Sequence, residues 1–201
     1  MQILDLTGVW SLKKRGNSEI QNISAEVPGG VHPALISAGI IQDPGEGDNA
    51  EKYKWVGESD WIFERPFEVD AAMLSQDIVD IEFDGIDTLS EVFVNDKSVL
   101  KTDNMFRRWR ADVKDVLRAG VNTVRVEINS PRRLGAKVGA RKAKYGFGSV
   151  YSPECVTAGI CRPLRVRAWN EARICDLGFS QRHDEGSVSV FMGGWIEVAG
   201  D

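Results

Sequence analysis

The sequence predicts an all-β protein organised as a β-sandwich or jelly roll with a few short helices, and two observations predict it. Apolar and polar residues alternate in many short segments, which is the pattern of a strand with one buried face and one solvated face. Gly-rich connections separate these segments and few stretches have helical periodicity, so the pattern favours a sandwich over an alternation of strands and helices.

Strand candidates run through most of the chain. In VNTVRVEIN, for example, Val124, Val126 and Ile128 alternate with charged residues, as in a half-buried strand. Residues 95–97, which follow EVFV, predict a tight hairpin because Asn and Asp tolerate the left-handed backbone of such turns. In chain order the other candidates are GVWSL, WIFERPFEV, DIVDIEFDG, EVFVND, RPLRVRAW, ARICDLGF and SVSVFM.

Two stretches predict short helices. VHPALISAGI has Pro33 near its first turn and Gly39 at its end, which is the usual punctuation of a helix. VKDVLRAG predicts one or two further turns that close at Gly120. The segments Asp43–Asp60 and Pro131–Pro163 interrupt the strand pattern, and because long connections in compact domains are commonly functional, function is to be sought there.

Composition argues against several classes of protein. The chain has 201 residues and a formal net charge of −5, so neither nucleic acid nor anionic lipid is expected as a partner. It contains no run of about 18 apolar residues and no basic-then-apolar N-terminus, so no membrane span or signal peptide is expected. Its three cysteines are too few for a disulfide scaffold and indicate a reducing compartment, so we expect a cytoplasmic protein.

Residue spacing predicts no metal or cofactor site. Acidic residues gather between Asp43 and Glu51, but their spacing does not match a Ca²⁺ loop, which favours a solvated acidic loop. The cysteines and His183 lack the paired clamp of zinc sites. His32 lies on the apolar side of the first predicted helix and is interpreted as a core or capping residue. With only two histidines present, no nucleophilic triad emerges.

A basic run without acidic residues occupies residues 131–153. Its members are Arg132, Arg133, Lys137, Arg141, Lys142 and Lys144. One interpretation is a phosphate or RNA contact. The favoured one is a solvated segment that docks on an acidic neighbour, because the rest of the chain is more acidic than its net charge suggests.

Position distinguishes four of the six tryptophans. Trp10, Trp61 and Trp169 lie in strand patterns and are predicted to belong to the core. Trp55 lies in the long acidic segment, where its ring is a candidate for stacking on a sugar, because aromatic faces pack well against the C–H faces of sugar rings.

Six stretches go beyond generic strand patterns. They are LTGVWSL, VPGGVHPALISAGIIQDPGEGDNAEKYKWVGESDWIFERPFEV, FDGIDTLSEVFVND, TDNMFRRWRADVKDVLRAGVNTVRVEINSP, RKAKYGFG and TAGICRPLRVRAW. In this order they resemble the N-terminal domain of β-mannosidases in glycoside hydrolase family 2. The resemblance extends to about Arg173 and involves multiple ordered segments, so it is specific.

The resemblance implies a jelly-roll β-sandwich, similar to galactose-binding domains, over residues 1–172. It also implies that residues 173–201 are the incomplete opening strands of a second, immunoglobulin-like β-domain. In that family the first domain packs on a TIM barrel that carries both catalytic glutamates of a retaining mechanism. This chain is therefore expected to hold no catalytic residue, no metal and no cofactor. Its expected partners are that barrel, within the same parent chain, and a β-mannoside or related carbohydrate.

One departure from the family pattern follows RKAKYGFG. The family typically has W-D-W-G-P there, with the aspartate holding sugar hydroxyls, whereas this chain has S-V-Y-S-P over residues 149–153. Val150 takes the aspartate position and cannot accept a hydrogen bond from a hydroxyl. The sugar and linkage therefore stay open, and Val150→Asp in the complete protein is expected to strengthen mannoside processing. Cys161 also stands where the family usually has tryptophan. Trp55 and Tyr151 are the expected substrate-binding residues.

The leading hypothesis is a non-catalytic domain that walls one side of a β-mannosidase-like cleft, with the segments Asp43–Asp60 and Gly146–Thr157 facing that cleft. One alternative is a stand-alone carbohydrate-binding module that uses Trp55, Tyr53 or Tyr151 as stacking platforms. Another is a protein-interaction sandwich with no glycan role. Titration with mannose separates the first two, because a wall without its barrel is expected to bind sugar very weakly.

Overall fold

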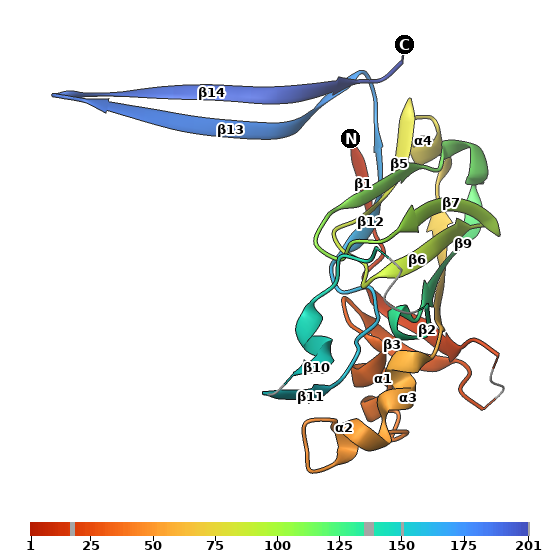
Figure 1. Cartoon of the computed structure of the whole chain (residues 1–201). Coiled ribbons are helices and arrows are strands. Elements are labelled where there is room, and N and C mark those ends of the chain that lie inside the picture. Colours follow the sequence, from red (N-terminus) through yellow and green to blue (C-terminus); the bar gives the residue numbers. More distant parts are fainter. Residues whose placement is uncertain (17–18, 135–138, 150, 201) are drawn as a thin grey trace.

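Two antiparallel sheets form the body of the protein (Figure 1). The computed structural model describes residues 1–16, 19–134, 139–149 and 151–200. Buried residues of both sheets belong to a single hydrophobic core, so the sheets pack on each other as predicted for a β-sandwich.

The larger sheet has six strands in the order β3-β2-β4-β9-β6-β7. Its strands are β2 (Gly8–Lys14), β3 (Ile23–Val27), β4 (Trp61–Val69), β6 (Leu89–Val94), β7 (Lys97–Thr102) and β9 (Gly120–Asn129). The register of the central pair places Trp61 of β4 opposite Ile128 of β9. Asn95 and Asp96 connect β6 to β7 with positive φ angles of 49° and 65°, which confirms the predicted tight turn.

The smaller sheet has four strands in the order β1-β12-β5-β8. Its strands are β1 (Gln2–Asp5), β5 (Ile78–Phe83), β8 (Trp109–Asp112) and β12 (Leu164–Trp169). Strand β12 alternates as predicted, with Leu164 and Val166 buried and Arg165 and Arg167 less buried. This alternation directs a row of charged side chains to the outer face of the sheet.

Large aromatic side chains fill the core. Trp10, Trp61 and Trp169 have exposures of 1%, 0% and 2%, which confirms their predicted places. The indole N–H groups of Trp10 and Trp61 donate to the carbonyls of Leu6 and Val56, each at 2.9 Å, so burial leaves these donors paired. Complete burial of a large apolar side chain stabilises a fold by about 1.5–3 kcal/mol, so these rings are major contributors.

The first predicted helix is present and the second is shorter than predicted. Helix α1 (Val31–Ser37) ends before Gly39, which has a φ angle of 69°. Of residues 113–120, only Lys114–Val116 form a short 3-10 helix, because Leu117 has an extended backbone (φ −82°, ψ 153°) and leads the chain toward β9. Among the described residues, no helix is long and apolar enough to cross a lipid bilayer.

Both long segments are partly structured, although sequence patterns had suggested irregular connections. The first contains α2 (Asn49–Lys52) and α3 (Lys54–Glu58), and a further short helix, α4 (Ala71–Leu74), follows β4. The second contains α5 (Pro131–Leu134), a 3-10 turn (Lys144–Gly146), β10 (Phe147–Ser149) and β11 (Ser152–Glu154). These elements span one turn or a few residues, so their sequences are too short for a periodic pattern to reveal them.

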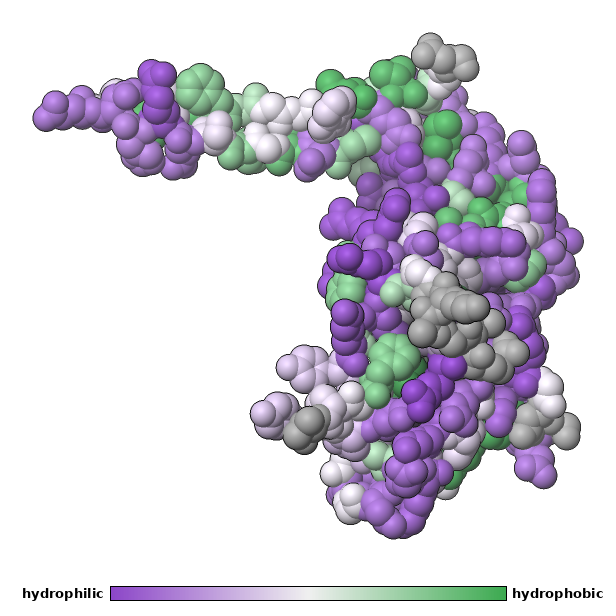
Figure 2. All heavy atoms as spheres, viewed as in Figure 1, coloured by the Kyte–Doolittle hydropathy of each residue, from purple (hydrophilic) through white to green (hydrophobic). Residues whose placement is uncertain are grey.

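The last two strands leave the sandwich. Strands β13 (Ala172–Asp184) and β14 (Ser187–Val198) pair with each other and project from the body (Figure 1). Large apolar side chains along this hairpin are exposed, and Figure 2 shows apolar residues among its polar ones. They are Ile174, Leu177, Phe179, Val188, Val190, Phe191, Met192, Trp195, Ile196 and Val198. The hairpin therefore presents an uncovered apolar surface. A two-stranded ribbon alone is only marginally stable in water.

Candidate functional site

The two long segments meet at one end of the sandwich, where Figure 1 shows α1, α2, α3 and the β10–β11 hairpin. Gly57 of α3 lies against the second segment, since a Cβ placed on it would be 2.7 Å from the Cβ of Val156. Lys54 Nζ lies 4.0 Å from a carboxylate oxygen of Glu154. The fold therefore brings together the segments in which function was sought. We call this part, residues 43–60 with residues 139–160, the loop end.

Tyr151 occupies the tip of the β10–β11 hairpin. Ser149 pairs with Ser152 across the hairpin, and the Tyr151 N–H donates to Ser149 Oγ at 3.1 Å. Tyr151 is 93% exposed, so its ring is open to solvent. Val150, at the position of the family aspartate, lies outside the described residues.

Trp55, the other predicted substrate-binding residue, has different surroundings. It lies in α3, is half-buried and packs against the core. Its ring centroid is 6.2 Å from that of Trp61, and the Lys14 ammonium lies 4.7 Å from the Trp55 centroid. Tyr53 is also half-buried against the core. The loop end thus contains one fully accessible aromatic candidate, Tyr151, and two partly covered ones, and the sugar-binding role of each stays a prediction.

A buried ion pair lies at the root of the hairpin. Lys142 and Asp87 contact each other through their charged groups, and the two residues are 8% and 3% exposed. Lys142 Nζ also donates to the carbonyl and hydroxyl oxygens of Thr157, at 2.8 and 3.0 Å. The Thr157 hydroxyl in turn donates to the second carboxylate oxygen of Asp87 at 2.6 Å. These three residues, called the Lys142 cluster below, satisfy one another's polar groups.

The basic run is only partly a solvated segment. Arg132 Nε lies 2.8 Å from a carboxylate oxygen of Glu154, which confirms docking on an acidic neighbour. Lys142 is buried, which corrects the expectation that solvent covers the whole run. Sequence reasoning missed this burial because the partner of the lysine is 55 residues away along the chain. Lys137 and the side chain of Arg133 lie outside the described residues.

A histidine and a thiol lie near the Lys142 cluster. His32 in α1 is buried, as predicted, and its Nε2 lies 3.4 Å from Cys155 Sγ. Burial, and secondarily the charge of Lys142, lowers the pKa of His32, so its imidazole is neutral at pH 7. Burial raises the pKa of the Cys155 thiol, so this pair lacks the thiolate that nucleophilic catalysis needs. In the part of the chain that the structure describes, no three His, Cys, Asp or Glu side chains are arranged to hold a metal ion.

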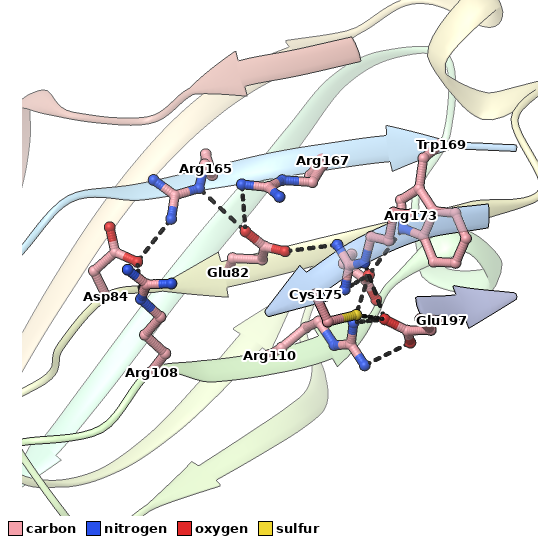
Figure 3. Close-up of polar contacts among 11 residues, drawn as sticks. Glu82, Asp84, Arg108, Arg110, Arg165, Arg167, Trp169, Arg173, Cys175 and Glu197 are labelled. Atoms are coloured by element: carbon pink, nitrogen blue, oxygen red, sulfur yellow. Dashed lines mark hydrogen bonds and ion pairs between the residues drawn. The ribbon is translucent and has the colours of Figure 1, made fainter. Parts of the chain in front are cut away.

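A second charged cluster joins the β13–β14 hairpin to the outer face of the smaller sheet (Figure 3). Glu82 of β5 forms ion pairs of 3.0, 3.1 and 3.2 Å with three arginines. These are Arg173, Arg165 and Arg167. Arg110 of β8 forms a two-pronged pair with Glu197 of β14, at 2.6 and 2.7 Å. We call this cluster, which lines a cavity of about 300 Å³, the junction.

Asp80 of β5 is buried beside the junction. Burial raises the pKa of this carboxyl to about 6, against the opposing effects of Arg110 and the hydrogen bond from Trp169. Arg173 also lies close, with a nitrogen 3.4 Å from the carboxylate. The hydrogen bond from Arg110 instead lowers the pKa of Glu197. Guanidinium groups pair with these carboxylates across the junction. The junction therefore links the β13–β14 hairpin to the smaller sheet.

The chain is similar to known proteins in sequence and in fold. The sequence profile described as "Glycosyl hydrolase 2 galactose-binding domain-like" matches residues 10–162. A β-mannosidase of Capra hircus is 31% identical over 86% of this chain. The crystal structure of a β-D-mannosidase from Dictyoglomus thermophilum superposes with a TM-score of 0.92 at 33% identity over 98% of this chain.

The likeness shows the family and the fold, and it does not by itself identify the sugar. The chain spans 23% of the length of the goat protein and 26% of the Dictyoglomus chain. An exo-chitosanase from Amycolatopsis orientalis has a TM-score of 0.74 at 16% identity, a likeness that shows the fold alone. The fold is thus shared by proteins with different named activities, and the sugar is a question for the site.

Proposed function

Because the chain belongs to the glycosyl hydrolase 2 galactose-binding-domain-like family, we propose that it is the N-terminal, non-catalytic wall domain of a β-mannosidase-like glycoside hydrolase. In this proposal the loop end borders the substrate cleft. The catalytic carboxylates belong to a barrel elsewhere in the parent chain, on which this domain packs. The substrate is a β-mannoside or a related β-glycoside.

The meeting of the two long segments at the loop end is the observation that carries this proposal. It gathers chain from residues 43–60 and 139–160 around a hairpin that presents an exposed tyrosine. An exposed aromatic ring at the edge of a cleft can stack on the apolar face of a sugar without itself taking part in bond cleavage. Such a surface orients a substrate and leaves the chemistry to carboxylates supplied by another domain.

Residues 173–201 form the opening strands of a second, immunoglobulin-like β-domain in this proposal. Their exposed apolar side chains support the assignment, because further strands of the parent chain would cover them. The ion pairs of the junction hold the root of this hairpin on the smaller sheet. The jelly-roll connectivity of residues 1–172 is part of the same proposal.

Removal of the exposed ring tests the role of the loop end. In the complete parent protein, Tyr151→Ala is expected to lower kcat/KM for an aryl β-mannoside about tenfold, since an aromatic contact contributes roughly 1–1.5 kcal/mol. Tyr145→Ala is the matched control, because Tyr145 is an exposed tyrosine in the turn before β10 and not in the connection between β10 and β11. An unchanged kcat/KM for Tyr151→Ala, or equal losses in both variants, contradicts the proposal.

The isolated chain provides a second test. Residues 1–201 alone are expected to leave aryl β-mannosides intact, because the proposal assigns both catalytic carboxylates to another part of the parent. Turnover by the purified chain above that of a mock purification would refute the wall-domain assignment.

The exposure of Tyr151 also favours a second candidate function, a stand-alone carbohydrate-binding module. Calorimetric titration of the isolated chain with manno-oligosaccharides separates the two. A wall domain without its barrel is expected to show no saturable binding. Saturable binding that Tyr151→Ala abolishes would instead support the module.

A further inference from the structure

We propose that the Lys142 cluster is a positioning device that fixes the β10–β11 hairpin, and with it Tyr151, at the loop end. Three segments contribute to it. Lys142 lies in the segment that leads into the hairpin, here called the first leg, and Thr157 lies in the segment that follows the hairpin, here called the second leg. Asp87 lies in the connection between β5 and β6. The inference rests on the proposed function only in naming a glycoside as the ligand for which the hairpin is held.

The second leg is anchored to the sandwich through its backbone. Asp87 and Gly159 exchange N–H···O hydrogen bonds of 2.8 and 3.0 Å, and the Val31 N–H donates to the carbonyl of Ala158 at 2.8 Å. The backbones approach closely here, since a Cβ on Gly159 would lie 2.5 Å from the Cα of Gly30. This crossing of three segments is therefore a rigid base from which the second leg leaves.

The first leg is anchored to a more exposed part of the chain. The Arg141 N–H donates to the carbonyl of Asp103 at 2.8 Å, and the Met105 N–H donates to the carbonyl of Arg141 at 3.0 Å. Asp103 and Met105 belong to the connection between β7 and β8. The side chain of Lys142 adds a link from this leg to the rigid base at Asp87 and to the second leg at the same time.

A buried ion pair of this kind fixes the relative position of the segments that carry it more than it increases the free energy of unfolding. Removing two charges from water costs much of what their attraction returns, so apolar side chains of equal size often stabilise a fold as well. An apolar contact is satisfied by many relative positions, whereas a charged pair with shared hydrogen bonds is satisfied by few. The Thr157 hydroxyl accepts from Lys142 and donates to Asp87, so it narrows those positions further.

Hydrogen exchange in the chain of residues 1–201 tests the positioning. Thr157→Val keeps both charges and removes the shared hydroxyl, and the double variant Lys142→Met/Asp87→Asn removes both charges together. In both variants the amides of residues 147–149, 151, 152, 154 and 155 are expected to exchange at least about tenfold faster, while the central strand β4 keeps its protection. Lys144→Met, at an exposed lysine on the same leg, is the matched control and is expected to change neither region.

The comparison with β4 separates positioning from a general effect on stability. A purely structural role would raise exchange in β4 by the same factor as in the hairpin, because both would open through global unfolding. That result, or hairpin exchange unchanged in both variants, overturns the inference. If the double variant does not fold, Thr157→Val decides, because it introduces no unpaired charge.

Kinetics of the complete parent protein test the link to Tyr151 and keep this inference separable from the proposed function. Thr157→Val is expected to raise KM for an aryl β-mannoside about threefold in the natural background and to have no further effect on top of Tyr151→Ala, since both act through one ring. An undiminished effect in the Tyr151→Ala background overturns the link. If Tyr151→Ala alone changes nothing, the proposed function fails, and the exchange experiment still decides whether the cluster positions the hairpin.

Discussion

The loop end and the junction use the same ion-pair chemistry in different surroundings. At the loop end one ammonium meets one carboxylate, and the side chains of Lys142 and Asp87 are only 3% and 4% exposed. At the junction several guanidinium groups share several carboxylates. There the side chains of Arg110 and Glu197 are 40% and 31% exposed.

The exposure of an ion pair to water decides how much the loss of one partner lowers the free energy of unfolding. Removing one member of a buried pair leaves a charge that no solvent can stabilise, whereas removing one member of an exposed pair leaves a charge that water can solvate. A substitution of similar chemistry should therefore reduce the free energy of unfolding much more at the Lys142 cluster than at the Arg110–Glu197 pair of the junction. Four measurements test this contrast, in order of decreasing expected effect.

The largest effect is expected for Asp87→Ala. It leaves the Lys142 ammonium buried without its carboxylate and should reduce the free energy of unfolding by about 3–5 kcal/mol. Urea denaturation followed by tryptophan fluorescence measures this change. The matched double variant Asp87→Ala/Lys142→Met should recover much of the loss, because no charge then stays buried. A loss below about 1 kcal/mol would mean that water reaches Lys142 and that the two clusters do not differ.

Backbone crowding provides the next largest contrast. Gly159→Ala should destabilise the protein by about 2–3 kcal/mol, because the new methyl group would meet the backbone of Gly30. Gly193→Ala in the projecting hairpin should change stability by no more than about 0.5 kcal/mol, since no atom lies within 4 Å of the new methyl group. Thermal denaturation of both variants measures the two effects. Equal shifts in Tm would show that the backbones of Gly159 and Gly30 are not closely packed.

The pH dependence of stability should reveal Asp80. Its folded-state pKa of about 6 lies above the ordinary value of 3.8, so the folded protein binds this proton more tightly than the unfolded chain does. Its stabilising contribution is complete below pH 3.8 and is lost as the pH rises through about 6. Relative to Asp80→Asn, the natural protein should lose about 2 kcal/mol of unfolding free energy between pH 4 and pH 7. Parallel pH profiles of the two proteins would contradict the raised pKa.

The smallest effect is expected for Glu197→Gln at the junction. Glu197 is partly exposed, so the loss of its pairs with Arg110 and Arg173 should reduce the free energy of unfolding by at most about 1 kcal/mol, and less at high salt. Denaturation at two salt concentrations measures both features. A loss comparable to that of Asp87→Ala would show that the junction excludes water and would remove the contrast between the two clusters.

Strands and core were largely predictable from sequence, because alternation is a local property that needs no knowledge of partners. WIFERPFEV and VNTVRVEIN coincide with β4 and most of β9, and the three core tryptophans lie where their strand positions indicated. The predicted second helix was too long, because the chain turns into extended backbone at Leu117. The one-turn helices α2 and α3 left no periodic signal of their own.

The sequence identified the two segments that form the candidate site, but it did not predict how their side chains are arranged. Their length and composition marked residues 43–60 and 131–163 as candidates, and the structure brings parts of both together. Their aromatic residues looked equivalent in sequence, yet Trp55 packs against the core and Tyr151 stands in solvent. Which face of an aromatic ring is free depends on neighbours such as Lys14, 41 positions before Trp55 in the printed sequence.

The amino-acid sequence is sufficient to identify a β-sandwich of the glycosyl hydrolase 2 galactose-binding-like kind, because periodicity and ordered motifs are local properties of the chain. Which charged groups are removed from water depends on the tertiary fold. In the sequence Lys142 is one member of a basic run, and the fold buries it against Asp87, 55 residues away, whereas the side chain of Arg110 in the junction is 40% exposed. Solvation depends on everything that surrounds a group in space, and a linear pattern does not contain that information.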